Sequence, residues 1–446
     1  MSKFNEYLQS LIRSRDISVS RLSRESGVER TSLHRALAGE RVLPYQALQL
    51  LVRSLELSPG ETRKLYQYFN LLFESKAAGQ AREIIDRIFS RLSELPDGAA
   101  DGKQFLHSDS LMDMNGERET FKGQGEISRL ILGMMLEELK CEKPRLEVVA
   151  PPDIQAVIKG IESIYETGAD IMTAHIMCFQ TSGDEEQCHL HNLEYLGCVL
   201  PCCVLSDKKY HVYYYYNDKF QTRYTDPLPY FLVTHRGVVC LSENIQTAIV
   251  LRDEEQIAYF HSHFYELKKF CHRLVGYTEA AESRMKHTAL RDGYCLVTGQ
   301  LYRMNLETKK STIIFTRNCI SEFLNTGRLN IFLSGEEEVV DKVRRLEFLH
   351  TFLENIRNGH VKGRMVNEMF FGVPNHLAVL ASEDFCTCTL SAERTMPLQL
   401  QIQERNLCQA FHDWAIHLSD SDWVFDMEKT AEVLTELYRL WQREGD

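Results

Sequence analysis

The chain has 446 residues, of which 44% are hydrophobic and 26% charged, and its formal net charge is −12. This length allows two or three domains, each with its own core. No apolar run approaches the roughly 18 residues that cross a bilayer, so no membrane partner is expected. The first residues, MSKFNEYLQSLIRSRD, alternate charged and apolar side chains, unlike a secretory signal or a transit peptide. Thirteen cysteines without framework spacing favour a reduced, cytoplasmic location over a disulfide scaffold.

Charge is distributed unevenly along the chain. Residues 1–95 hold 15 Lys and Arg against 11 Asp and Glu, a net charge of +4, whereas residues 96–446 hold 36 against 52, a net charge of −16. A polyanion such as DNA would be attracted to the first segment and repelled by the rest.

The first segment carries helical periodicity interrupted by turn residues. Its first apolar stripe predicts an amphipathic helix at the start of the chain (Phe4, Tyr7, Leu8, Leu11 and Ile12). Ser18 can cap a second helix, which Gly27 ends by allowing a left-handed turn. A third helix is predicted from near Glu29 to Gly39. Further helices follow, and Ser58 with Glu61 predicts a capping box at the start of one of them.

Two short helices joined by a glycine turn form a helix-turn-helix. The pattern resembles the Cro/CI (XRE) family of transcriptional regulators over about residues 3–70, through seven residues: Ser18, Leu22, Gly27, Val28, Leu33, Gly39 and Leu55. One departure is Leu37, where the family often has Glu. The resemblance implies a DNA-binding repressor that holds a double-stranded operator as a two-fold homodimer.

In that family the third helix enters the major groove by its N-terminal end. The outward side chains predicted to contact bases are Arg30, Thr31, His34 and Arg35, because Leu33, Ala36 and Leu37 must point inward. Four more are predicted to contact phosphates: Ser18, Ser20, Ser32 and Arg41. Arginine can bond guanine with two hydrogen bonds. The alternative is a solvated basic face on a structural helical module.

Residues 96–118, rich in Pro, Gly, Asp and Ser, predict a flexible linker. An apolar stripe follows on a predicted helix from Ile127 to Leu139. This stripe packs either on its own domain or against a second subunit.

From Arg145 onward, strand and helix patterns alternate, which indicates α/β layers. The apolar run LGCVLPCCVL is predicted as one of the strands. We therefore predict an α+β multidomain protein with an all-α domain (1–95), a linker (96–118) and two α/β lobes with mixed sheets (119–285 and 286–446).

The two lobes carry matching residues, which indicates a duplication. Phe260-His261 matches Phe411-His412 at an offset of 151, and His211-Val212 matches His360-Val361 at an offset of 149.

The segment AIVLRDEEQIAYFHSHFYEL resembles the closing part of phospholipase D-like domains. That family carries His-x-Lys-x4-Asp once per lobe. The first lobe has His211, Tyr213 and Asp218, so the lysine is lost; the second has His360, Lys362 and Asn367, so the aspartate is lost. The resemblance implies that His211 and His360 would attack phosphorus and Lys362 would neutralise phosphate oxygens. Because both motifs are incomplete, we expect no enzyme activity.

Cysteine and histidine also gather in one stretch (Cys188, His189, His191, Cys198, Cys202 and Cys203). The spacing lacks the paired ligands of structural zinc sites, so we expect buried thiols, with no metal and no cofactor. The run Tyr213–Tyr216 is either a stacking platform or, as we expect, a strand with alternating faces.

The sequence as a whole favours a transcription regulator whose α/β region senses a small-molecule or protein effector or assembles the dimer. The alternatives are a phospholipase D-like phosphodiesterase or nuclease targeted by the DNA-binding domain, and a protein-interaction module that does not bind DNA.

Overall fold

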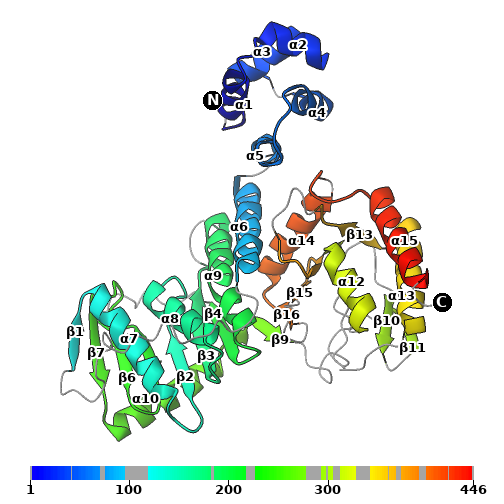
Figure 1. Ribbon diagram of the computed structural model, residues 1–446. Helices are drawn as coiled ribbons and strands as arrows, with labels where there is room; N and C mark the ends of the chain where they lie inside the picture. Colours follow the sequence, from blue (N-terminus) through cyan, green and yellow to red (C-terminus); the bar gives the residue numbers. More distant parts are fainter. Residues whose placement is uncertain are drawn as a thin grey trace. The chain divides into compact units, whose positions relative to one another are not determined.

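The computed structural model (Figure 1) consists of an all-helical segment followed by two α/β lobes. It describes residues 3–41, 43–70, 76–95, 119–181, 185–216, 227–277, 293–297, 300–304, 312–327, 342–359, 361–367, 373–390, 398–419 and 421–443. The predicted linker, 96–118, lies outside these residues. The chain divides into two compact units whose boundary falls between Gln80 and Ala81. The predicted fold class, an α+β multidomain protein with mixed sheets, is confirmed.

The head, as we call residues 3–70, is built from α-helices around one apolar core. Its helices are α1 (Lys3–Ser14), α2 (Val19–Ser26), α3 (Arg30–Ala38), α4 (Tyr45–Ser54) and α5 (Pro59–Asn70). The predicted turn glycines end two of them: Gly27 after α2 has φ 72° and Gly39 after α3 has φ 79°. Leu22, Leu33 and Leu48 are fully buried in the core. The sequence therefore folds locally as predicted.

Arg15 and Glu61 tie the start of α5 to the end of α1. Ser58 and Glu61 form the predicted capping box: the Ser58 backbone N–H donates to Glu61 Oε2 at 2.9 Å, and the Glu61 N–H donates to Ser58 Oγ at 3.3 Å. Arg15 Nη2 also donates to Glu61 Oε2 at 2.7 Å, and Arg15 Nε donates to the Leu55 carbonyl at 2.6 Å. These contacts, led by the Arg15 hydrogen bond, lower the pKa of Glu61 to about 2.

The first lobe is an eight-stranded mixed sheet, within the described residues, of order β1-β7-β6-β5-β2-β3-β4-β8. Its strands are β1 (Thr120–Lys122), β2 (Arg145–Val149), β3 (Met172–Phe179), β4 (Tyr210–Tyr216), β5 (Tyr230–Val233), β6 (Val238–Leu241), β7 (Thr247–Leu251) and β8 (His272–Arg273). Strands β2, β3 and β4 are parallel, and β5, β6 and β7 are antiparallel.

Helices cover both faces of this sheet. They are α7 (Gln124–Glu138), α8 (Gln155–Glu166), α9 (Glu185–Leu205) and α10 (Glu254–Lys268). Phe264 of α10 packs on one face, against Ile176, Phe231 and Val238. Helices α7, α8 and α9 pack against one another and the sheet (Figure 1). The apolar stripe of α7 is buried within its own lobe, which resolves the alternative between core packing and a second subunit.

The prediction of a strand at LGCVLPCCVL is wrong, because these residues form the second half of α9. This part of α9 is apolar nearly all round, since it is buried between α8 and β4. A continuous apolar run does not distinguish a buried helix from a buried strand.

The second lobe is a six-stranded mixed sheet, within the described residues, of order β13-β12-β14-β15-β16-β9. Its strands are β9 (Val275–Tyr277), β12 (Thr312–Phe315), β13 (Lys362–Met365), β14 (Leu377–Ser382), β15 (Phe385–Leu390) and β16 (Leu398–Ile402). A hairpin is formed by β10 (Gly293–Val297) and β11 (Gln300–Met304). The helices are α12 (Arg317–Thr326), α13 (Lys342–Arg357), α14 (Arg405–Ser419) and α15 (Met427–Arg443).

The two lobes repeat one plan. Strands β3-β2-β5-β6-β7 in the first and β13-β12-β14-β15-β16 in the second each place a parallel pair beside an antiparallel series. Each series is followed by a helix, α10 or α14, and these helices carry the two Phe-His pairs offset by 151. The match at offset 149 is not tested, because His360 lies outside the described residues; His211-Val212 are on β4, and Val361 directly precedes β13.

The lobes are joined by residues 272–277 and by helix α6 (Lys76–Ser93). Strand β8 pairs with β4 of the first sheet, and β9 pairs with β16 of the second. On α6, Asp86 Oδ1 accepts from Trp414 Nε1 of α14 at 3.0 Å, and Arg91 forms two hydrogen bonds with Glu162 of α8. Helix α6 therefore packs against both lobes. No helix in the described part of the chain has the length and apolar character needed to span a bilayer.

Candidate nucleic-acid interface and the pocket of the first lobe

One side of α3 is exposed and basic. Leu33, Ala36 and Leu37 are buried on the inner side of the helix, as predicted. On the outer side, Arg30, His34 and Arg35 are exposed, and none of their side chains forms a hydrogen bond or ion pair with another described residue. The spacing of four between Arg30 and His34, and between Thr31 and Arg35, places these side chains along one strip of the helix.

Glu29, which precedes α3, adds a negative charge at the N-terminal end of this strip. Its carboxylate accepts hydrogen bonds from Thr31 Oγ1 at 2.8 Å and from Ser32 Oγ at 3.2 Å. These two bonds lower the pKa of Glu29, with smaller effects from Arg41 and Arg35. Thr31 and Ser32 are predicted from the sequence to contact DNA, whereas Glu29 is not among the predicted residues. Its position directly before α3 is the feature of the sequence that could have placed Glu29 at this interface.

The four residues predicted to contact phosphates differ in how exposed they are and in the hydrogen bonds they already form. Ser18 caps α2, since its Oγ accepts from the Arg21 backbone N–H at 3.2 Å, which leaves its hydroxyl hydrogen for another acceptor. Ser20 and Ser32 are half-buried, and Arg41 is exposed. The structure thus leaves Ser18 and Arg41 the most accessible of the four.

In the first lobe, His211 lines a pocket of about 940 Å³ at the N-terminal ends of β2, β3 and β4. Arg273 Nη2 lies 2.9 Å from His211 Nδ1. Because a guanidinium only donates, Nδ1 accepts and the ring proton is on Nε2. Burial, Arg273 and Lys268 lower the pKa of His211 to about 4, so the ring is neutral near pH 7.

Within the described residues, the structure does not bring Lys362 of the second phospholipase D-like motif to His211. Lys362 is the exposed first residue of β13, where it pairs with Thr312. His360 and Asp218 lie outside the described residues. Among the residues that are described, no hydrogen bond or ion pair joins His211 to Lys362.

The cysteine and histidine stretch lies on α9, where Cys188, Cys202 and Cys203 are buried. Burial raises the pKa of the Cys203 thiol to about 12. The tyrosine run alternates as predicted: Tyr214 is buried against Phe179, and Tyr213 lies on the side of α10, beneath Lys268.

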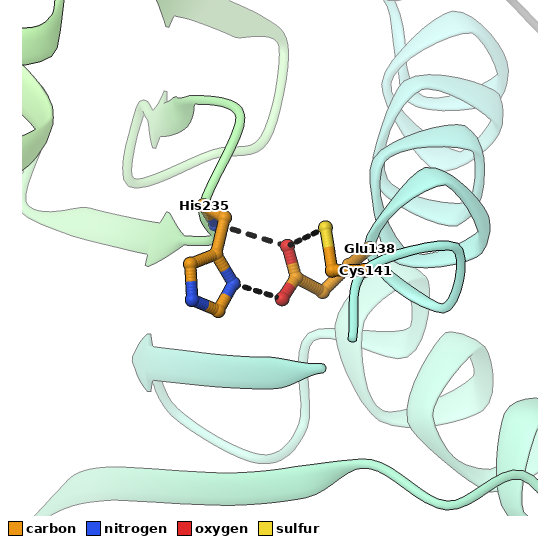
Figure 2. Close-up of side chains that lie close together, drawn as sticks. All are labelled: Glu138, Cys141 and His235. Carbon is orange, nitrogen blue, oxygen red and sulfur yellow. Dashed lines mark hydrogen bonds and ion pairs between the residues drawn. The ribbon is translucent and has the colours of Figure 1, made fainter. Parts of the chain in front are cut away.

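Two clusters of titratable side chains were missed by sequence reasoning. Buried Glu147 of β2 accepts from His261 Nδ1 of α10 at 2.8 Å, and burial raises the pKa of Glu147. Glu138, Cys141 and His235 form the second cluster (Figure 2). The second cluster could not be predicted, because His235 lies 97 residues after Glu138 in the sequence. The two side chains meet because α7 packs beside the turn between β5 and β6.

Comparison with known proteins gives little further information. No family model matches the chain, and no curated protein matches it. Among solved structures, TrmBL2, an archaeal chromatin protein with a novel mode of DNA binding, is 15% identical over 61% of this chain and 100% of its own, with a TM-score of 0.23. Polyphosphate kinase from Porphyromonas gingivalis is 9% identical over 78% of this chain, with a TM-score of 0.25, and the match spans 59% of the kinase. Both TM-scores are below 0.5, so neither neighbour assigns a function.

Proposed function

We propose that this protein is a sequence-specific DNA-binding transcription regulator that uses α3 of the head to contact the major groove. The observation that carries the proposal is the strip of Arg30, His34 and Arg35, which are exposed and unpaired among the described residues, on a helix whose other side is locked into the core. Residues 1–70 hold 11 Lys and Arg against 7 Asp and Glu, a net charge of +4 in a chain of net charge −12. The head is therefore the part that a polyanion would approach.

In this proposal Arg30 and Arg35 contact guanine edges, while Thr31 and His34 contact neighbouring bases. Ser18, Ser20, Ser32 and Arg41 hold the phosphate backbone and fix the register without reading sequence. By its resemblance to Cro/CI (XRE) repressors, the protein would bind paired half-sites as a homodimer. A small-molecule or protein effector would act on the α/β unit, for which the 940 Å³ pocket is a candidate site.

Selection of bound fragments from random DNA with the full chain tests this proposal. We expect an enriched operator that Arg30→Ala with Arg35→Ala binds at least tenfold more weakly, because a good arginine–guanine pair contributes about 1–3 kcal/mol. The matched control is Arg13→Ala with Arg53→Ala, which removes the same charge from exposed positions outside α3.

Equal losses in the two double variants would mean that only net charge matters, and would contradict sequence reading by α3. A wild-type chain that enriches no sequence would instead favour a protein-interaction module.

We also propose that the α/β unit does not hydrolyse phosphodiesters. With Nδ1 accepting from Arg273, the His211 Nε2 carries the ring proton and has no lone pair with which to attack phosphorus. Tyr213 stands where the family has its lysine. We expect His211→Ala and wild type to show the same absence of turnover with a chromogenic phosphodiester; hydrolysis lost only in the variant would overturn this.

A further inference from the structure

Three side chains with different ligand atoms converge beside the pocket of the first lobe. Glu138 is the last residue of α7, Cys141 lies in the turn after it, and His235 lies in the turn between β5 and β6. A carboxylate oxygen, the Cys141 Sγ and a ring nitrogen of His235 all lie within 4.8 Å of one another. Figure 2 shows the Glu138 carboxylate between the thiol and the imidazole. We propose that Glu138, Cys141 and His235 form a zinc site.

The set of ligand atoms selects the metal. Zinc is bound in proteins by thiolate, imidazole and carboxylate, whereas Mg²⁺ and Ca²⁺ take oxygen ligands almost exclusively. With bonds of about 2.0–2.3 Å in a tetrahedron, zinc needs ligand atoms roughly 3.5 Å apart. Cys141 Sγ now lies 3.9 Å from Glu138 Oε2, and His235 Nδ1 lies 2.5 Å from Glu138 Oε1. Small side-chain rotations therefore suffice to admit the ion.

The backbone holds the carboxylate in place for this role. Glu138 is fully buried, and each of its oxygens accepts from one backbone N–H: Oε1 from Arg145 at 2.8 Å and Oε2 from His235 at 2.9 Å. Each oxygen keeps a further lone pair, and these are the ones that the His235 ring and the Cys141 thiol approach. Hydrogen bonds of this kind orient the ligands of metal sites. On binding, the metal would stand where the proton between His235 Nδ1 and Glu138 lies, the neutral ring would carry its proton on Nε2, and the thiol proton would be released to solvent.

The pocket gives the site an entrance and an open position. Cys141 and His235 both line the 940 Å³ pocket, together with Arg145 and Lys268. The His235 side chain is 39% exposed, so an ion can reach it from solvent. Three protein ligands leave the fourth position of a tetrahedron to water or to a small anion that enters the pocket.

Calorimetric titration of the chelator-treated full chain with Zn²⁺ tests the proposal, which does not depend on DNA binding. We expect one ion per chain with micromolar affinity or tighter, and a loss of at least tenfold in Cys141→Ser and in His235→Ala. Glu138 is left unchanged, because it also holds two backbone N–H groups. Titration with Co²⁺ gives a second readout: a thiolate-to-cobalt absorption band that Cys141→Ser abolishes.

Cys271→Ser and His263→Ala, in the same lobe but outside the cluster, serve as matched controls and should bind as wild type does. Circular dichroism checks that every variant is folded. The proposal is overturned if the wild-type chain takes up no zinc, or if folded Cys141→Ser and His235→Ala bind it as tightly as the controls.

Discussion

At the scale of single residues, Glu29 is the clearest addition that the structure makes to the proposed interface. Its carboxylate stands at the N-terminal end of α3, where an approaching phosphate backbone meets a negative charge. Like charges a few ångströms apart repel one another even in water, most strongly at low salt. We therefore expect Glu29→Gln to strengthen binding to non-specific DNA about fivefold in a fluorescence-anisotropy titration at low salt.

Glutamine keeps the shape of the side chain and one accepting oxygen, which can hold the shorter bond from Thr31, whereas the longer bond from Ser32 to the second oxygen is lost with the charge. Glu6→Gln, at an exposed position of α1, is the control for net charge alone. Weaker binding in Glu29→Gln than in the control would show instead that the carboxylate itself contacts DNA, for example as an acceptor for cytosine.

His175 makes stability depend on pH. It is fully buried; its Nε2 donates to the Ala150 carbonyl at 2.8 Å, so Nδ1 accepts from the Tyr210 hydroxyl at 2.6 Å. Burial lowers the pKa of His175 to about 4. Below about pH 6.5, His175 is protonated in the unfolded chain but stays neutral in the folded chain, so the free energy of unfolding falls as the pH falls. Below about pH 4 the folded chain is protonated as well, and His175 causes no further loss.

The expected contribution is about 3 kcal/mol over that interval. Urea unfolding of the α/β unit at pH 7 and at pH 4.5 measures it, and His175→Gln should show a shallower decline than wild type. An equal decline in both would assign the pH dependence to other groups. His263→Ala, at an exposed position, should leave the decline unchanged.

At the scale of elements, the turn between α2 and α3 depends on Gly27. Its φ of 72° is left-handed, and a Cβ placed there meets no atom within 4 Å. The penalty for Gly27→Ala is therefore a backbone penalty, about 1–2 kcal/mol. We expect this loss in the free energy of unfolding of the head, measured by hydrogen exchange of α2 and α3 amides. Gly60→Ala, which has open space and no such backbone requirement, should cost little.

The helices of the head were predictable from sequence because each carries its own signals: the Ser18 cap, the glycine ends and the Ser58–Glu61 box all act within a few residues. The second half of α9 was not predictable in this way. Its continuous apolar pattern reflects burial between α8 and β4 and carries no local signal that distinguishes a helix from a strand. Likewise, the exposed arginines of α3 followed from helical periodicity, whereas the partners of Glu138 and His211 come from strands and turns far along the chain. Periodicity carries no information on such contacts.

At the scale of the whole molecule, the head and the α/β unit have separate apolar cores. The cluster around Leu33 contains residues of the head alone, and the clusters around Phe352 and Phe264 contain residues of the α/β unit alone. Domains with separate cores unfold as separate cooperative units. We therefore expect two transitions when the full chain is heated in a calorimeter.

A core substitution in each unit identifies the transitions. Leu33 and Phe352 are both buried, and a change of either to alanine removes roughly 2–5 kcal/mol of stability. Leu33→Ala should lower the melting temperature of one transition by more than about 8 °C and leave the other in place, because 1 kcal/mol shifts a domain of this size by about 4–8 °C. Phe352→Ala should move only the other transition, and by fewer degrees per kcal/mol, because the α/β unit is much larger than the head. If either change moves both transitions together, the two units unfold as one cooperative unit, and a change in the stability of the α/β unit would then be felt at α3.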